Sequence, residues 1–170
     1  MPGITMYFIS FLSFFQKNLI DILLHHCIKD DSGTYHLFYS RWPKSLGFTA
    51  WLTHSEIAHA TASRLEGPYR YQETVLKGQT GSWDAVTAHN VQVRQWDNRF
   101  YLYYISINTG KENWSDSFLK EVARVGYSHA RWNDLRNRQR AGVAVSSSLN
   151  GPWKRADHPL LEPNGPIEHV

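Results

Sequence analysis

Short aromatic and apolar runs alternate with polar turns along most of this chain. The clearest runs are Tyr35 to Ser40 (YHLFYS) and Phe100 to Ile105 (FYLYYI), and each follows a turn rich in Asp, Asn, Ser or Gly. Aromatic runs between such turns are typical of β-strands. A shorter run precedes each of them, at residues 27–29 and 90–94. The pattern therefore predicts two β-hairpins.

Two further segments copy each other at an offset of 84 residues. Residues 57–69 read IAHATASRLEGPY and residues 141–153 read AGVAVSSSLNGPW, so that Gly67 and Gly151 are 84 positions apart. Each copy begins with small, β-prone residues and ends in Leu-x-Gly-Pro, a composition that favours a tight reversal. The chain is thus built from a repeated unit of short strands.

Each copy adds a third and a fourth strand to its hairpin. We expect third strands at residues 56–62 and 140–146 and fourth strands at residues 69–76 and 153–161. Four antiparallel strands per repeat is the plan of a β-propeller blade. We therefore expect an all-β fold with about two blades, residues 25–78 and 83–163, in a partial propeller domain over residues 25–170.

The second unit carries an insertion between its second and third strands, at about residues 108–138. Ser115 is a candidate N-cap for a short helix. The apolar side chains that fall on one side of that helix are Phe118, Leu119, Val122 and Val125. The pattern predicts a helical excursion on one rim of the propeller, and we interpret its arginines, Arg131, Arg136 and Arg138, as a solvated face rather than a phosphate site.

Residues 1–24 differ from the rest of the chain. Residues 4–15 (ITMYFISFLSFF) are apolar, but a membrane-spanning helix needs about 20 such residues, so we expect no stable membrane span. An apolar N-terminal helix packed on the domain, a poor secretory signal, and a start that replaces the true N-terminus are three interpretations. We favour the last, because two blades cannot close a propeller ring. For location, the sequence favours secretion or the periplasm.

Composition and charge narrow the function classes. The chain is 42% hydrophobic and 14% aromatic, and flat rings with a polar edge suit sugar faces. The net charge is +3, with basic residues scattered until Arg131 to Arg140, so we expect no nucleic-acid partner. Cys27 is the single cysteine, which excludes an internal disulfide. No zinc-type spacing relates His54, His59 and His89, so we expect neither metal nor cofactor.

Several segments together resemble a known family. They are YHLFYSRWP (35–43), AWLTHSEIAHA (50–60), WDAVTAHN (83–90), YLYYI (101–105) and QRAGVAVSSSLNGPW (139–153). They resemble the five-bladed β-propellers of glycoside hydrolase family 43 and, more broadly, the arabinanase, levansucrase and invertase superfamily. The resemblance runs from about Lys29 to Pro163. It implies glycosidase chemistry on a poly- or oligosaccharide.

Such enzymes place three carboxylates at one mouth of the central channel, two of them on opposite sides of the anomeric carbon. This chain departs from that pattern. Its first blade has residues 24–27 (LHHC), without a carboxylate, where the resemblance implies an Asp. Its second has His89-Asn90-Val91 where relatives commonly carry His-Asn-Pro. The blade that supplies the acid Glu follows Pro163 in the pattern. We therefore expect a truncated propeller without a full catalytic set.

The candidate catalytic carboxylates are Asp84, on the approach to the second blade, and Glu56, at the start of a third strand. His89 and Asn90 open the innermost strand of the second blade, where side chains line the channel and can bind sugar hydroxyls. The other candidates for substrate binding are Arg41, Trp51, His54, Trp83 and Arg140. Structural roles are the alternatives: a turn residue for Asp84, an interblade salt bridge for Glu56 and Arg140, and core packing for the tryptophans.

Three hypotheses about function follow. The first is a glycoside hydrolase-like propeller protein that acts on or binds carbohydrate. The second is a non-catalytic carbohydrate-binding or protein-interaction module, in which sheet faces left uncovered by missing blades favour self-association. The third and weakest is a polyanion-binding domain that uses residues 131–140.

Overall fold

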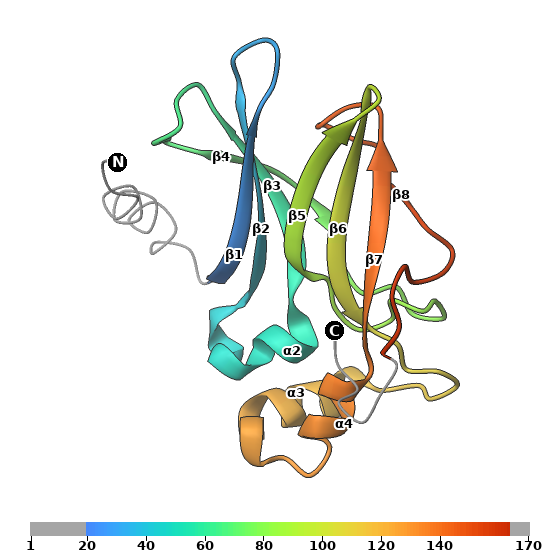
Figure 1. The fold of residues 1–170 in the computed structure, drawn as a ribbon. Coiled ribbons are helices and arrows are strands. Elements are labelled where there is room, and N and C mark those ends of the chain that lie inside the picture. Colours follow the sequence, from blue (N-terminus) through green and yellow to red (C-terminus); the bar gives the residue numbers. More distant parts are fainter. Residues whose placement is uncertain (1–19, 164–170) are drawn as a thin grey trace, which may run out of the picture.

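The computed structural model describes residues 20–163, which form two four-stranded antiparallel sheets (Figure 1). The first contains β1 (Ile20–Lys29), β2 (Tyr35–Pro43), β3 (Glu56–Ala62) and β4 (Arg70–Leu76), and the second β5 (His89–Trp96), β6 (Arg99–Ile107), β7 (Gln139–Ser146) and β8 (Lys154–Arg155). In both sheets the strand order follows the chain. This confirms the prediction of two propeller blades.

The 84-residue repeat is also visible in the strand register. Phe38 on β2 pairs with His59 on β3, and Tyr103 on β6 pairs with Val143 on β7, which lies 84 positions after His59. Phe38 and Tyr103 therefore hold equivalent positions in the two blades. The Gly-Pro turns match as well, because Gly67 and Gly151 have φ angles of 85° and 78°, which glycine adopts readily.

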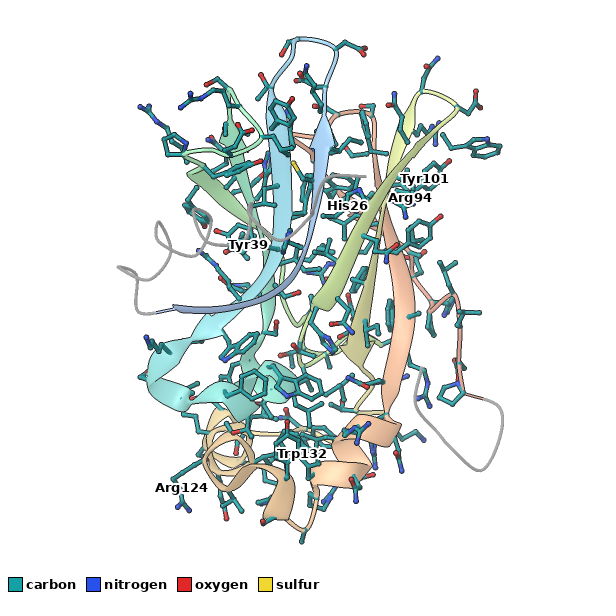
Figure 2. All side chains as sticks on the ribbon, turned by 60° about the vertical axis from the view of Figure 1, so that its left-hand side comes forward. His26, Tyr39, Arg94, Tyr101, Arg124 and Trp132 are labelled. Carbon is teal, nitrogen blue, oxygen red and sulfur yellow. The ribbon has the colours of Figure 1, made fainter. Side chains whose placement is uncertain are left out.

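The two blades pack face to face over a shared apolar core. Phe38, Ile57 and Leu76 from the first blade meet Leu102 and Tyr104 from the second in one buried cluster. β5 packs against β1 and β2, and His26 on β1 reaches Arg94 on β5 at 3.5 Å (Figure 2). β1 and β5 are therefore neighbouring first strands, as in consecutive blades.

A helical layer covers one end of both sheets (Figure 1). Its helices are α2 (Trp51–His54), α3 (Asp116–Val125), α4 (Trp132–Asn137) and the short 3-10 helices η2 (Lys44–Leu46), η3 (Phe48–Ala50) and η4 (Gly126–Ser128). Ser115 caps α3 as predicted, its Oγ accepting from the Phe118 N–H at 3.2 Å. Trp132, at this end in Figure 2, is buried with Leu52 and Ile107. The insertion thus closes over the loop between β2 and β3.

An N-terminal helix, one of the three interpretations of residues 1–24, is wrong for the last part of that segment, because residues 20–24 lie in β1. β1 begins at Ile20 rather than near Cys27, because β2 continues to Pro43 and offers paired backbone as far as Ile20. The predicted apolar run 4–15 lies outside the described residues. Within residues 20–163, no helix is long and apolar enough to cross a membrane. The fourth strand of the second blade is also shorter than predicted, since β8 holds two residues.

Candidate functional site

A cavity of about 530 Å³ opens at the helical end of the molecule, between the two blades. Three segments line it: residues 53–56 before and at the start of β3, residues 77–86 between β4 and β5, and residues 109–119 before and in α3. Each segment joins or starts a strand or helix of the fold described above. The cavity is therefore positioned by both blades and by the helical insertion.

Glu56 reaches this cavity from the first residue of β3 and is held by Arg41. The two residues face each other in the register of β2 and β3, and Arg41 Nη2 lies 2.7 Å from Glu56 Oε1. Thr74 Oγ1 donates to the same oxygen at 3.0 Å, and the Arg41 guanidinium covers the ring of Tyr71 at 4.5 Å. Among the described residues, Glu56 Oε2 has no hydrogen-bond partner, so one oxygen of this carboxylate remains available.

His54 and Ser55 lie beside Glu56 in the cavity wall. His54 Nδ1 is 2.7 Å from Thr53 Oγ1, whereas its Nε2 is 3.6 Å from Asp116 Oδ1, beyond a good hydrogen bond. Burial lowers the pKa of His54, against the opposing effect of Asp116. His54 Nε2 and Ser55 Oγ are both buried and without a hydrogen-bond partner in the described structure. Buried polar groups normally have partners, so each of these two atoms can take one further hydrogen bond.

His89 opens β5 and is buried, but it is not among the residues that line the cavity. It is 3% exposed, its Nε2 lies 3.0 Å from Gln139 Nε2, and the edge of the Trp51 ring packs against it at 5.4 Å between centroids. Burial lowers the pKa of His89 to about 4, so the imidazole is neutral at pH 7. Asn90 adopts a φ of 55°, and its N–H donates to Ser40 Oγ at 3.0 Å. The start of β5 is thereby fixed to the first blade.

Asp84 lies in a separate network inside the second blade. It is 1% exposed, Tyr104 Oη donates to Oδ2 at 2.8 Å, and Arg155 Nη1 lies 2.5 Å from the same oxygen. Ser82 Oγ also bonds to its other oxygen. Trp83 stacks on Tyr104 and donates from Nε1 to the Ala156 carbonyl at 3.0 Å. These contacts are those of a buried ion pair, and the catalytic role of Asp84 stays a prediction.

Some of the candidate residues thus lie at or next to the cavity, whereas others lie apart from it. His54 and Glu56 line the cavity, Arg41 pairs with Glu56, and Trp51 packs against the buried cluster of Leu52 and Ile107. Arg140 lies apart from Glu56, at 3.6 Å from Glu162 and bonded to the carbonyls of Asn137 and Gln139. The equivalence of Glu56 and Arg140 in the repeat does not make them a pair, because Arg41 is the closer cation on the adjacent strand.

Sequence reasoning identified only His54 and Glu56 among the residues that line the cavity. Lys77, Lys111, Glu112 and Asp116 line it, and none was a candidate. They lie in the connection between the blades and in the insertion, which we had interpreted as a rim. For Lys111 and Glu112 the available signal was their position just before the Ser115 cap. Within residues 20–163, no group of three His, Cys, Asp or Glu side chains is arranged to hold a metal ion.

Two of the three insertion arginines, Arg131 and Arg138, are held in ion pairs. Arg131 Nη2 lies 3.0 Å from Glu112 Oε2 and 2.7 Å from Asp134 Oδ2, and Arg138 pairs with the same two carboxylates. Both guanidiniums lie against the ring of Trp114, at 5.7 and 5.3 Å from its centroid. A closed network of two arginines and two acids offers little free charge to a polyanion.

The fold is similar to that of solved glycoside hydrolases. A family 43 β-xylosidase/α-arabinofuranosidase from a compost microbial metagenome, in complex with xylotriose, has 16% identity and a TM-score of 0.54, covering 82% of this chain and 36% of that one. A family 117 glycoside hydrolase of Zobellia galactanivorans has 19% identity and a TM-score of 0.53, covering 82% of this chain and 32% of that one. A family 43 enzyme of Xanthomonas citri complexed with xylotriose has 13% identity and a TM-score of 0.54, covering 88% of this chain and 38% of that one.

These similarities confirm the resemblance at the level of the fold. This chain spans about a third of the length of the solved proteins it matches. No protein-family model matches the sequence, and no curated protein matches it. The chain thus has a glycoside hydrolase-like propeller fold, of which the described residues form two blades.

Proposed function

We propose that this protein binds an oligosaccharide in the cavity between its two blades, as a glycoside hydrolase-like propeller protein. The observation that carries the proposal is the pair of buried, unpartnered polar atoms, His54 Nε2 and Ser55 Oγ, in residues that line a cavity of about 530 Å³. Cavities of about 300–1,000 Å³ with a few converging polar groups are typical of small-molecule sites. Sugar hydroxyls both donate and accept hydrogen bonds, so they suit these two atoms.

The solved neighbours support this ligand class. Proteins with this fold have been solved with xylotriose and with xylose bound. Their sequence identity to this chain is low, so they suggest carbohydrate as the ligand without indicating which sugar or where it binds. Xylotriose is therefore a reasonable first probe.

Binding is better supported than hydrolysis by these two blades. Glycoside hydrolysis needs a carboxylic acid that stays protonated, with a raised pKa, opposite a second carboxylate. A hydrogen bond from Trp114 and bonds from Arg131 and Arg138 lower the pKa of Glu112 to about 2. Lys120 likewise lowers the pKa of Asp116. These two cavity carboxyls are therefore ionised, and neither resembles a general acid.

Hydrolysis is the second candidate function, with Glu56 and Asp84 as the predicted carboxylates. The observation in its favour is the unengaged Oε2 of Glu56 at the cavity wall. In this hypothesis Glu56 acts as base or nucleophile at the cavity, and Asp84, the second predicted carboxylate, lies apart from the cavity in a buried ion pair with Arg155.

Calorimetric titration with xylotriose tests binding. We expect Ser55→Ala to weaken binding about tenfold, since it removes a hydrogen-bonding group from the cavity. Ser45→Ala is the matched control, because Ser45 is exposed in η2 and does not line the cavity. Equal affinity of the wild type and Ser55→Ala would contradict the proposed site.

Release of nitrophenol from aryl xylosides and arabinosides tests hydrolysis. Activity that disappears in Glu56→Gln, while xylotriose still binds, would favour the enzyme. Wild-type binding without turnover would favour the non-catalytic module. Asp84→Asn is interpreted only together with its unfolding curve, because Asp84 also supports the fold.

A further inference from the structure

The charges around the cavity between the blades are unequally compensated. Three carboxylates line it, and each is paired with a cation that lies outside the lining: Glu56 with Arg41, Glu112 with Arg131 and Arg138, and Asp116 with Lys120. The distances in these pairs are 2.5–3.0 Å. The negative charge of the lining is therefore largely neutralised by the protein itself.

The positive charge of the lining is not neutralised in this way. Lys77 comes from the segment after β4 and Lys111 from the segment before α3, so the two lysines reach the cavity from different blades. Both are exposed, and within residues 20–163 neither takes part in an ion pair. His54 adds no charge at pH 7, because burial lowers its pKa. The cavity thus combines two free ammonium groups with the unpartnered atoms of His54 and Ser55.

We propose that the cavity selects an anionic saccharide, a sugar unit that carries a carboxylate or a sulfate group. The acidic group faces Lys77 and Lys111, and the sugar hydroxyls meet the polar part of the lining around His54 and Ser55. A charge-assisted hydrogen bond is about twice as strong as a neutral one, so two ammonium groups discriminate an acidic sugar from a neutral one. This inference rests on the proposed carbohydrate-binding function and deepens it.

Four probes separate the sources of affinity: digalacturonate, sulfated galactobiose, neutral galactobiose and inorganic phosphate. Each is titrated into the full chain by calorimetry at low and at physiological salt. We expect at least one acidic disaccharide to bind about tenfold or more tightly than galactobiose, and this advantage to shrink as salt rises. The acidic probe that binds more tightly identifies the anionic group.

Substitutions test whether the two cavity lysines cause the preference for acidic disaccharides. We expect Lys77→Gln and Lys111→Gln each to weaken binding of the acidic disaccharide about fivefold and to leave galactobiose binding unchanged. Lys154→Gln is the matched control, since Lys154 is exposed on β8 and outside the cavity lining. Ser55→Ala is expected to weaken the acidic and the neutral disaccharide alike.

The outcomes distinguish this inference from the function on which it rests. Equal binding of acidic and neutral disaccharides, with a loss in Ser55→Ala, would overturn the anionic preference and leave carbohydrate binding standing. Phosphate binding as tightly as the acidic disaccharides would overturn the preference in favour of a general anion site. Binding of none of the disaccharides would overturn the anionic preference, and only failure of xylotriose to bind as well would overturn the carbohydrate-binding proposal.

Discussion

Phe38 and Tyr103 occupy the same position in consecutive blades, yet Phe38 is 0% exposed and Tyr103 is 40% exposed. The difference arises from their neighbours. The face of the first blade that carries Phe38 packs against the second blade, where Trp153 meets its ring edge-on at 5.6 Å. The corresponding face of the second blade has no blade against it within residues 20–163. The relationship shows that these two blades pack as successive units of a propeller.

Replacing these two rings should have very different effects on stability. Phe38→Ala removes a ring from the core between the blades, and we expect it to lower the free energy of unfolding by about 3–5 kcal/mol. Tyr103→Ala, the matched variant, should cost less than about 1 kcal/mol. Urea unfolding followed by far-UV circular dichroism measures both. Similar losses in the two variants would show that Tyr103 is covered in solution, for example by another copy of the chain.

Gly142 is the position at which Trp83 approaches the backbone of β7. A Cβ atom added to Gly142 would overlap Cζ2 and Cη2 of the Trp83 ring. The equivalent residue of the first blade is Ala58, 84 positions earlier, so this part of a blade tolerates a methyl group where no indole lies over it.

We therefore expect Gly142→Ala to destabilise the protein by about 1–3 kcal/mol. Trp83→Leu in the same chain should recover part of that loss, because the smaller side chain leaves room for the methyl group. The coupling free energy from the double-mutant cycle is the measurement. Additive effects of the two substitutions would contradict the contact.

The ion pair of Asp84 and Arg155 should contribute to stability more than a surface pair does. Asp84 is 1% exposed, and its Oδ2 meets both the Arg155 guanidinium and the Tyr104 hydroxyl. Removing one partner of a buried pair costs about 3–5 kcal/mol, since the other charge stays uncompensated. We expect Asp84→Ala to lower the unfolding free energy in that range.

The exposed pair of Lys120 and Asp116 on α3 provides the control. Lys120→Ala should change stability by less than about 1 kcal/mol. An Asp84→Ala variant as stable as the wild type would instead favour the predicted functional role of this carboxylate, because a residue that does not support the fold needs another reason to be buried.

Stability should fall as the pH is lowered through the range of histidine titration. Burial, and secondarily the neighbouring His36, lowers the pKa of His59 to about 4, and burial does the same for His89. Their usual pKa is 6.5, so between about pH 4 and 6.5 the unfolded chain binds more protons than the folded one. Stability therefore rises with pH across this window and is lost as the pH falls through it, on the order of a few kcal/mol per histidine.

Urea unfolding at intervals between about pH 5 and 7 measures this slope. Most carboxylates titrate below this range, so they contribute little to the slope. The variant with His59→Gln and His89→Gln should show a flatter dependence, even if it is less stable throughout. His59 Nε2 lies 2.9 Å from His36 Nδ1, and His89 Nε2 lies 3.0 Å from Gln139, so glutamine preserves hydrogen-bonding capacity at both positions. An unchanged slope would mean that these histidines are not the source.

The sequence by itself determined the strands and the blades. Aromatic runs, Gly-Pro turns and the 84-residue repeat are local signals, and the backbone geometry of turns and strands depends on nearby residues. The cap of α3 at Ser115 was predictable for the same reason. The beginning of β1 at Ile20 was not, because it depends on how far β2 extends as a partner.

The site was decided by tertiary structure. Glu56 and His54 were recognisable as candidates, but their neighbours Lys77 and Lys111 come from segments that meet only when the two blades pack. Likewise, nothing near Asp84 in the sequence indicates Arg155, 71 residues away, as its partner. Charge compensation and burial act through space and not along the chain. Which carboxylates are neutralised, and which lysines stay free to meet a ligand, follows only from the packed structure.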